Sequence, residues 1–232
     1  MKKHVIVALF AAAALTLASC GGNAGGGQGG GDMQGMDHGG SGGDKAQQQD
    51  KQSGDMAGMD HGEMSADDMA SMSRDMVMPN GEYSDKAFID AMVPHHEGAV
   101  EMAEVAQENA EHAEIKTLAE DIISAQEAEI ETFGNKRQEK FGSAEGEMEM
   151  NEQDMQAMGM SDPEELSKAE PFDKAFIDDM IPHHESAIAM AEVAREKTDD
   201  PEIREIANDI VSAQEREIEQ MKQWRQQWYP EG

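Results

Sequence analysis

One stretch of the chain occurs twice, and this duplication constrains the fold more than any other feature of the sequence. Residues 85–132 align with residues 173–220 without a gap, and about 30 of the 48 aligned positions are identical, which indicates a tandem duplication. Each copy carries apolar residues at helical spacing in two successive segments. Because one pair of helices cannot bury its apolar face alone, we expect the two copies to pack against each other.

Four helices are predicted, two in each copy. The periodicity of apolar residues places them at residues 85–109, 113–133, 173–196 and 201–228. Gly134 and Asn135 are expected to end the second helix. The predicted fold class is therefore all-α, a ferritin-like four-helix bundle formed by two tandem helical hairpins, residues 82–134 and 171–232. Residues 135–170, rich in Met and acidic side chains, form a crossover long enough to run the length of a helix.

The beginning of the chain has the pattern of a lipoprotein signal peptide, residues 1–19. A basic start is followed by an apolar run, Val5 to Leu17, that is too short to span a bilayer with stop-transfer flanks. The sequence Leu-Ala-Ser-Cys then resembles a bacterial lipoprotein processing box. We expect lipidation of Cys20 and a protein anchored outside the cytoplasm, in the cell envelope. Cys20 is the only cysteine, which excludes an intramolecular disulfide and a zinc–thiolate site.

Residues 20–81 are predicted to be a disordered tether rich in Gly, Met and His. Two short units within it, starting at Asp32 and Asp55, each supply two methionines and one histidine. A disordered segment has no core for methionine to fill, so we interpret these side chains as weak collector sites for soft metal ions. The collector residues are Met33, Met36, His38, Met56, Met59 and His61.

The formal net charge of the chain is −31. Binding to nucleic acid requires clusters of Lys and Arg that neutralise phosphates, so nucleic acid is excluded as a partner. An acidic chain instead concentrates cations around itself.

The sequence Met-x-Pro-His-His lies inside the first helix of each copy. At 100° per residue, Met92, His95, His96 and Met102 fall on one face over about two and a half turns. Pro94 cannot donate a backbone hydrogen bond and is expected to kink the helix beside them. The predicted metal ligands in the two copies are Met92, His95, His96, Met102, Met180, His183, His184 and Met190.

A structural interpretation of these residues stays open. The histidines can be core residues satisfied by hydrogen bonds, and each methionine taken alone can be ordinary core packing. Adjacent helical residues diverge by about 100°, so the spacing leaves open whether His95 and His96 share one ion.

Ligand chemistry favours a soft metal ion. Thioethers suit Cu(I) and Ag(I), and imidazole binds copper in both oxidation states. A di-iron bundle needs Glu-x-x-His on two helices, but Met92, Val93, Met180 and Ile181 stand three residues before the histidines. Copper as Cu(I) is therefore the predicted metal, with silver next, and zinc or iron disfavoured.

The second helix of each copy carries a Gln and a Glu three residues apart. Gln126 continues an apolar stripe, so it should face inward and can hydrogen-bond a histidine, which would fix the ring tautomer. The alternative is a Gln–Glu pair at the edge of the core. The predicted supporting residues are Gln126, Glu129, Gln214 and Glu217.

Together these motifs resemble the bacterial family called domain of unknown function 305 (DUF305), which includes copper-binding CopM-like proteins. The second copy matches the family pattern throughout, at Met180, Pro182, His183, His184, Met190, Gln214, Glu217, Ile218, Met221 and Trp224. The first copy has Phe133 and Lys136 where the pattern has Met221 and Trp224. The resemblance implies a ferritin-like helical bundle outside the cytoplasm, copper or silver binding in some members, and Met221 as a further ligand.

The predicted function is binding of Cu(I) or Ag(I) for copper tolerance, sequestration or delivery, without enzymatic activity. The predicted partners are metal ions, the membrane that holds the lipid anchor and a copper-handling protein. Two alternatives come from other classes: a metal-dependent redox enzyme with its site in the bundle core, and a helical structural or partner-binding module that needs no metal.

Overall fold

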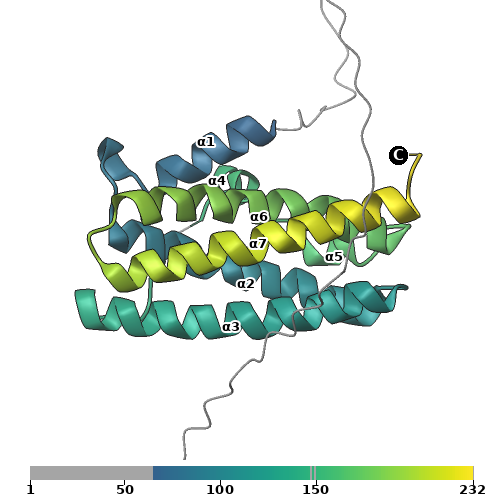
Figure 1. The fold of residues 1–232 in the computed structure, drawn as a ribbon, viewed down its shortest axis with the longest axis horizontal. Helices are drawn as coiled ribbons and strands as arrows, with labels where there is room; N and C mark the ends of the chain where they lie inside the picture. Colours follow the sequence, from purple (N-terminus) through teal and green to yellow (C-terminus); the bar gives the residue numbers. More distant parts are fainter. Residues whose placement is uncertain (1–64, 147, 149, 232) are drawn as a thin grey trace, which may run out of the picture. The chain divides into compact units, whose positions relative to one another are not determined.

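The structure of the protein is a computed structural model in which residues 65–146, 148 and 150–231 are described. These residues form α-helices and one 3₁₀ turn and contain no strand, so the predicted all-α class is confirmed (Figure 1). The elements are α1 (Ala66–Met76), η1 (Pro79–Gly81), α2 (Asp85–Asn109), α3 (Ala113–Phe141), α4 (Glu152–Ala157), α5 (Pro163–Leu166), α6 (Phe172–Lys197) and α7 (Pro201–Trp228).

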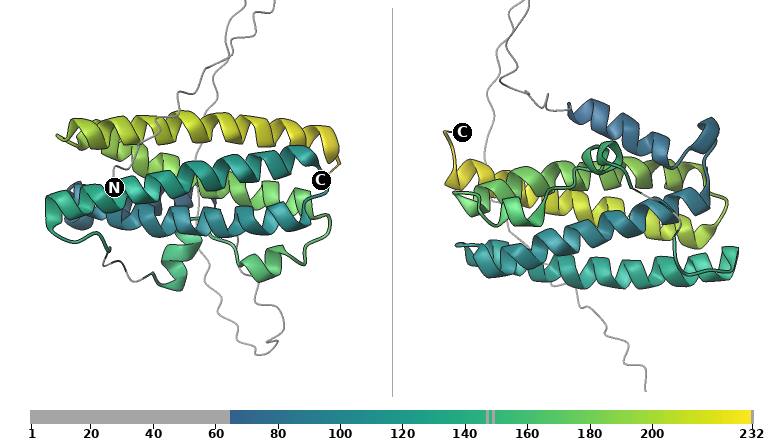
Figure 2. Two further views of the ribbon diagram at one scale, coloured as in Figure 1. Left: turned by 90° about the horizontal axis from the view of Figure 1, so that it is seen from below. Right: turned by 180° about the vertical axis from the view of Figure 1, so that it is seen from behind.

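The two copies form two helical hairpins, α2 with α3 and α6 with α7, which pack together mainly through α2 and α6 (Figures 1 and 2). At one end of this interface the Thr198 hydroxyl donates to Asp85 over 2.7 Å, and at the other the Glu111 amide donates to Asp173 over 2.9 Å. The start of each central helix thus lies beside the end of the other, so α2 and α6 are antiparallel. The predicted bundle of two tandem hairpins is confirmed.

Local signals set most helix ends. The Ser84 hydroxyl accepts a hydrogen bond from the Ala87 amide and caps α2. Asp200 caps α7, and Pro201 occupies its first turn, where a missing N–H costs nothing. Both central helices continue through their internal prolines, Pro94 and Pro182.

The prediction that Gly134 and Asn135 end the second helix is wrong. Helix α3 continues for two more turns to Phe141 and ends at Gly142, whose φ of 82° is the left-handed conformation that glycine adopts at helix ends. The added turns are held by tertiary contacts. Arg137 forms a buried ion pair with Asp90 of α2.

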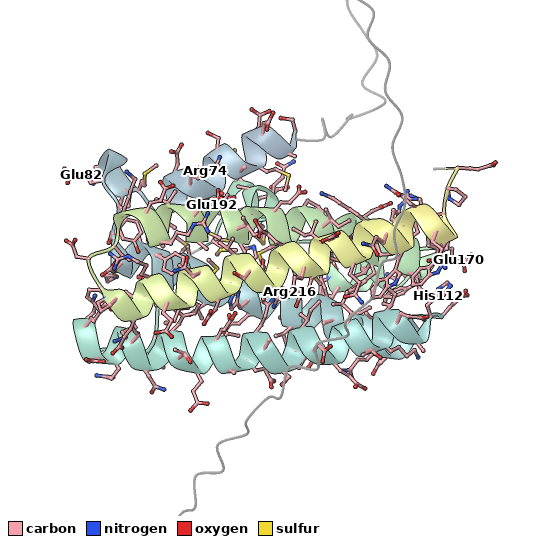
Figure 3. All side chains as sticks on the ribbon, viewed as in Figure 1. Arg74, Glu82, His112, Glu170, Glu192 and Arg216 are labelled. Carbon is pink, nitrogen blue, oxygen red and sulfur yellow. The ribbon has the colours of Figure 1, made fainter. Side chains whose placement is uncertain are left out.

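The prediction of disorder is wrong for residues 65–81. Ser65 caps α1, and α1 packs against α6 (Figure 1). Ser73 is fully buried and donates to the Ala157 carbonyl over 2.9 Å, and Figure 3 labels Arg74 of α1 close to Glu192 of α6, where their side chains are 3.8 Å apart. This segment folds because it covers the bundle rather than because of its own propensity.

The rest of the predicted tether lies outside the described residues. So do the predicted signal peptide, the predicted lipidation site Cys20 and the collector residues Met33, Met36, His38, Met56, Met59 and His61.

The crossover after α3 carries the short helices α4 and α5. Asn151 and Asp154 cap α4 reciprocally, and Asp162 and Pro163 begin α5. Between the two helices Met158 is fully buried against the bundle. No helix within the described ranges has the length and apolar character needed to cross a membrane.

Candidate metal centre

The four predicted histidine ligands meet at the middle of the bundle. His95, His96, His183 and His184 are all fully buried. The rings of His95 and His183 face each other across the α2–α6 interface with their centroids 3.8 Å apart. The neighbours along each helix are farther away, with centroids 6.1 Å apart in α2 and 6.3 Å apart in α6. One histidine of each copy therefore points to the other copy, and the second points to its own hairpin partner.

His96 and His184 reach the helices of their own hairpins. His184 Nε2 is hydrogen-bonded to Glu217 Oε2 over 2.7 Å. His96 Nε2 lies equally close to Glu129 Oε2, at 2.7 Å, but without the alignment of a hydrogen bond. The structure thus brings both glutamates to the histidines they were expected to support.

The predicted glutamines face inward as well. Gln126 and Gln214 are buried, and the Oε1 atom of each has no hydrogen-bond partner among the described residues. Buried polar atoms normally have partners, so each of these oxygens is an open acceptor in the core, and no hydrogen bond between either glutamine and a histidine is found among the described residues.

His95 and His183 differ in their surroundings. His95 Nε2 lies 2.7 Å from the Ser186 hydroxyl and 3.1 Å from the His183 carbonyl. Neither ring nitrogen of His183 has a hydrogen-bond partner in the part of the chain that the structure describes. Burial, together with the other histidines, lowers the pKa of both residues well below the ordinary value. Both rings are therefore neutral at physiological pH, and a neutral imidazole is the form that binds metal ions.

The predicted methionine ligands are buried on either side of the histidines. One apolar cluster contains Met92, Met190 and Met158, and the other contains Met102, Met180 and Met221. Sequence reasoning grouped the ligands by copy, with Met92 beside Met102. The structure instead pairs each methionine with one from the other copy, because α2 and α6 are antiparallel.

The donors at this centre are imidazole and thioether. Among the described residues, no three His, Cys, Asp or Glu side chains come together as a metal site. The free nitrogens of His183 and the adjacent buried thioethers suit a monovalent soft ion, which accepts low coordination by nitrogen and sulfur. The centre therefore fits Cu(I) or Ag(I).

Sequence reasoning missed two residues that touch this centre. Ser186 of α6 contacts His95, although the aligned residue Gly98 provides no hydroxyl. Met160 of the crossover reaches the core beside Gly98 and His183. The difference between residues 98 and 186 was visible in the aligned copies, but the approach of Met160 has no signal in the repeat.

Fold and site together define a duplicated helical bundle whose core holds paired histidines between methionines. The chain belongs to the family described as Domain of unknown function (DUF305), whose family model matches residues 28–137 and 85–225. The resemblance noted from the sequence is thus confirmed.

Solved structures of CopM are similar to the bundle. The chain is 40% identical to CopM in the Cu(II)-bound form, with a TM-score of 0.59 over 63% of this chain and 99% of that chain. The Cu(I)-bound form is also 40% identical, with a TM-score of 0.56 over 64% of this chain and 99% of that chain. The silver-bound form obtained by soaking is 38% identical, with a TM-score of 0.55 over 63% of this chain and 98% of that chain.

A curated relative is the uncharacterized protein L153 of Acanthamoeba polyphaga mimivirus. It is 43% identical over 49 residues, which are 21% of this chain and 32% of L153. This chain therefore matches about a third of that relative's length.

Proposed function

We propose that this protein binds Cu(I), and also Ag(I), in its bundle core and serves in copper tolerance, sequestration or delivery. It acts as a binding protein rather than an enzyme. A lipid at Cys20 would hold it outside the cytoplasm, where an oxidising environment disfavours thiols but leaves methionine and histidine usable.

The observation that carries the proposal is the buried His95–His183 pair with free ring nitrogens between two groups of buried methionines. Within the described residues, His95 Nδ1 and both ring nitrogens of His183 lack hydrogen-bond partners, and buried polar atoms left without partners are costly in an apolar core. A bound ion would offset that cost by using the free nitrogens. The similarity to CopM, which has been solved with copper and with silver bound, supports the choice of ion.

The roles of the individual residues follow from their positions. His95, His183, His96 and His184 are the nitrogen ligands, and Met92, Met102, Met180, Met190 and Met221 are the sulfur ligands. Glu129 and Glu217 orient the outer histidines. An orienting carboxylate makes the imidazole a better donor and fixes its tautomer.

The test is an anaerobic titration of the mature protein with Cu(I) against a competing chelator, followed by elemental analysis. We expect tight binding in the native protein and its loss when His95 and His183 are both replaced by Leu. His112→Ala is the matched control, because His112 stands at the start of α3 and is about one third exposed. Unchanged stoichiometry and affinity in the double variant would overturn the proposed site.

A second measurement does not depend on the variants. A ligand that binds only the native state raises the melting temperature, by an amount equivalent to about 2.7 kcal/mol at a free concentration of one hundred times Kd. We expect Ag(I) to raise the melting temperature of the native protein. The helical module without metal predicts no change.

The anchor is tested separately. Cys20→Ser should move the protein from the membrane fraction to the soluble fraction and remove the mass of the acyl chains. If native protein and variant fractionate identically, Cys20 does not carry the anchor.

A further inference from the structure

The two copies differ at one position beside the central histidines. Residues 98 and 186 are equivalent in the repeat, but one is Gly and the other is Ser. The Ser186 hydroxyl lies 2.7 Å from His95 Nε2. On the opposite side Gly98 has no side chain, and both ring nitrogens of the fully buried His183 lack a partner within the described ranges. Of the two central histidines, His95 and His183, only His183 therefore has a ring without any hydrogen-bond partner among the described residues.

The space over Gly98 is filled by a thioether. The terminal methyl of Met160 lies 2.5 Å from the point where a Cβ atom on residue 98 would stand, and His183 Nε2 lies 3.7 Å from the same point. Any larger residue at position 98 would push Met160 away. Gly98 thus lets the end of the Met160 side chain and the free nitrogen of His183 approach each other.

The loop that carries Met160 is docked on His183 through its backbone. The Ser186 hydroxyl lies 2.9 Å from the Met158 carbonyl, within range to donate to it. Gly159 has a φ of 65°, and a Cβ atom there would lie 2.8 Å from the His183 amide nitrogen. This approach is too close for any residue except glycine. The geometry of residues 158–160 therefore places Met160 at His183.

The outer side of Met160 faces a surface hollow of about 770 Å³. Met155 lines it and is 41% exposed, so a second thioether is available at the surface. The remaining lining includes the acidic residues Glu101, Glu152, Asp162 and Glu165. Carboxylates around a concave site raise the local concentration of cations.

We propose that Met160 and His183 bind one monovalent soft ion, Cu(I) or Ag(I), which reaches them through the hollow lined by Met155. The inference rests on the proposed function and adds to it a ligand from the crossover, outside the repeated helices. Thioether sulfur and neutral imidazole nitrogen are both ligands that these ions prefer. Among the described residues this arrangement occurs once, because His183 lies beside Gly98 whereas His95 lies beside Ser186.

The test compares three full-length variants by anaerobic titration with Cu(I). Met160→Leu removes the sulfur and keeps the volume, a change that cores tolerate. Gly98→Ser adds beside His183 the hydroxyl that His95 already has and displaces Met160. The matched control is Met148→Leu, which removes one partly buried crossover thioether that lines a different hollow, next to Asp90.

We expect Met160→Leu and Gly98→Ser each to weaken one Cu(I) site at least tenfold, while Met148→Leu binds as the native protein does. With Ag(I) as a diamagnetic probe, the Met160 methyl and His183 ring resonances should shift together in the native protein. If Met160→Leu binds like the native protein, or if the two resonances shift independently, the inference is wrong and the proposed function stands. If the native protein binds neither ion, the proposed function itself fails.

Discussion

Two equivalent ion pairs, one in each copy, differ in burial and allow a direct test of how the bundle is stabilised. Arg137 Nε lies 2.5 Å from Asp90 Oδ1, and its equivalent Arg225 Nε lies 2.6 Å from Asp178 Oδ1. The side chains of the first pair are 2% and 7% exposed, whereas those of the second are 19% and 38% exposed. The chemistry and geometry are nearly equal, so burial is the main variable.

The expected magnitudes follow from that difference. Asp90→Ala would remove the Asp90 carboxylate from the buried ion pair with Arg137, and breaking a buried pair by removing one partner costs about 3–5 kcal/mol. Asp178→Ala removes an exposed pair and should cost about 0–1 kcal/mol. Burial alone would raise the pKa of Asp90, but Arg137 and Lys86 outweigh it and lower that pKa. The charged carboxylate therefore stabilises the fold above the pKa of the unfolded chain, and this contribution is lost as the pH falls through the lowered value.

The assay is urea unfolding of the metal-free protein at pH 7, followed by circular dichroism. We expect Asp90→Ala to lose at least about 2 kcal/mol more than Asp178→Ala, with unchanged m-values. Arg137 also donates to the Ser143 carbonyl over 3.0 Å, so the loss should loosen the end of α3 and the start of the crossover. Equal losses in the two variants would refute the argument that burial determines the strength of these pairs.

Two further outcomes are expected. Burial lowers the pKa of His95 and His183 in the folded protein. As the pH falls below about 6.5, these two histidines therefore take up protons in the unfolded chain but stay neutral in the folded one. The free energy of unfolding should then drop by about 1.4 kcal/mol per pH unit for each residue. Urea unfolding from pH 7.5 to 5.5 measures this drop. If the free energy of unfolding falls equally steeply with pH in the variant with His95 and His183 both replaced by Leu, the expectation is wrong. Gly159→Ala should cost more than Gly142→Ala in the same assay, since both glycines have positive φ but only residue 159 abuts backbone. Equal costs would show that residue 159 is free to move.

The repeat determined which parts of the fold were predictable. Capping and apolar periodicity define α2 and α7, whose predicted bounds agree with the structure. The end of α3 was not predictable, because Gly134 is a local stop signal that the buried Arg137–Asp90 pair overrides. Helix α1 was missed for a related reason, since its stability comes from packing on α6 rather than from its own composition.

The site was predictable residue by residue but not as an arrangement. Helical spacing placed the histidines and methionines on the inward faces, where the structure has them. Which methionines meet depends on the antiparallel packing of α2 and α6, and spacing within one helix carries no information on that. Loop residues such as Met160 follow no periodicity, so their approach to His183 could not be predicted.

The crossover supplies a buried methionine to the apolar cluster in which the first copy has Phe133 instead of a methionine. Phe133 occupies the position equivalent to Met221, so the first copy has one thioether fewer in its own hairpin. Met158 of the crossover is buried in the same cluster as Phe133, and each of the two clusters consequently holds three buried methionines: Met92, Met158 and Met190 in one, and Met102, Met180 and Met221 in the other. A chain with two copies has only one crossover between them, so the crossover can supply only one side. The crossover supplies Met158 to the cluster that has Phe133 at the position equivalent to Met221. Because Phe133 already fills the volume of the missing methionine, this correspondence favours a role for the buried thioethers beyond packing.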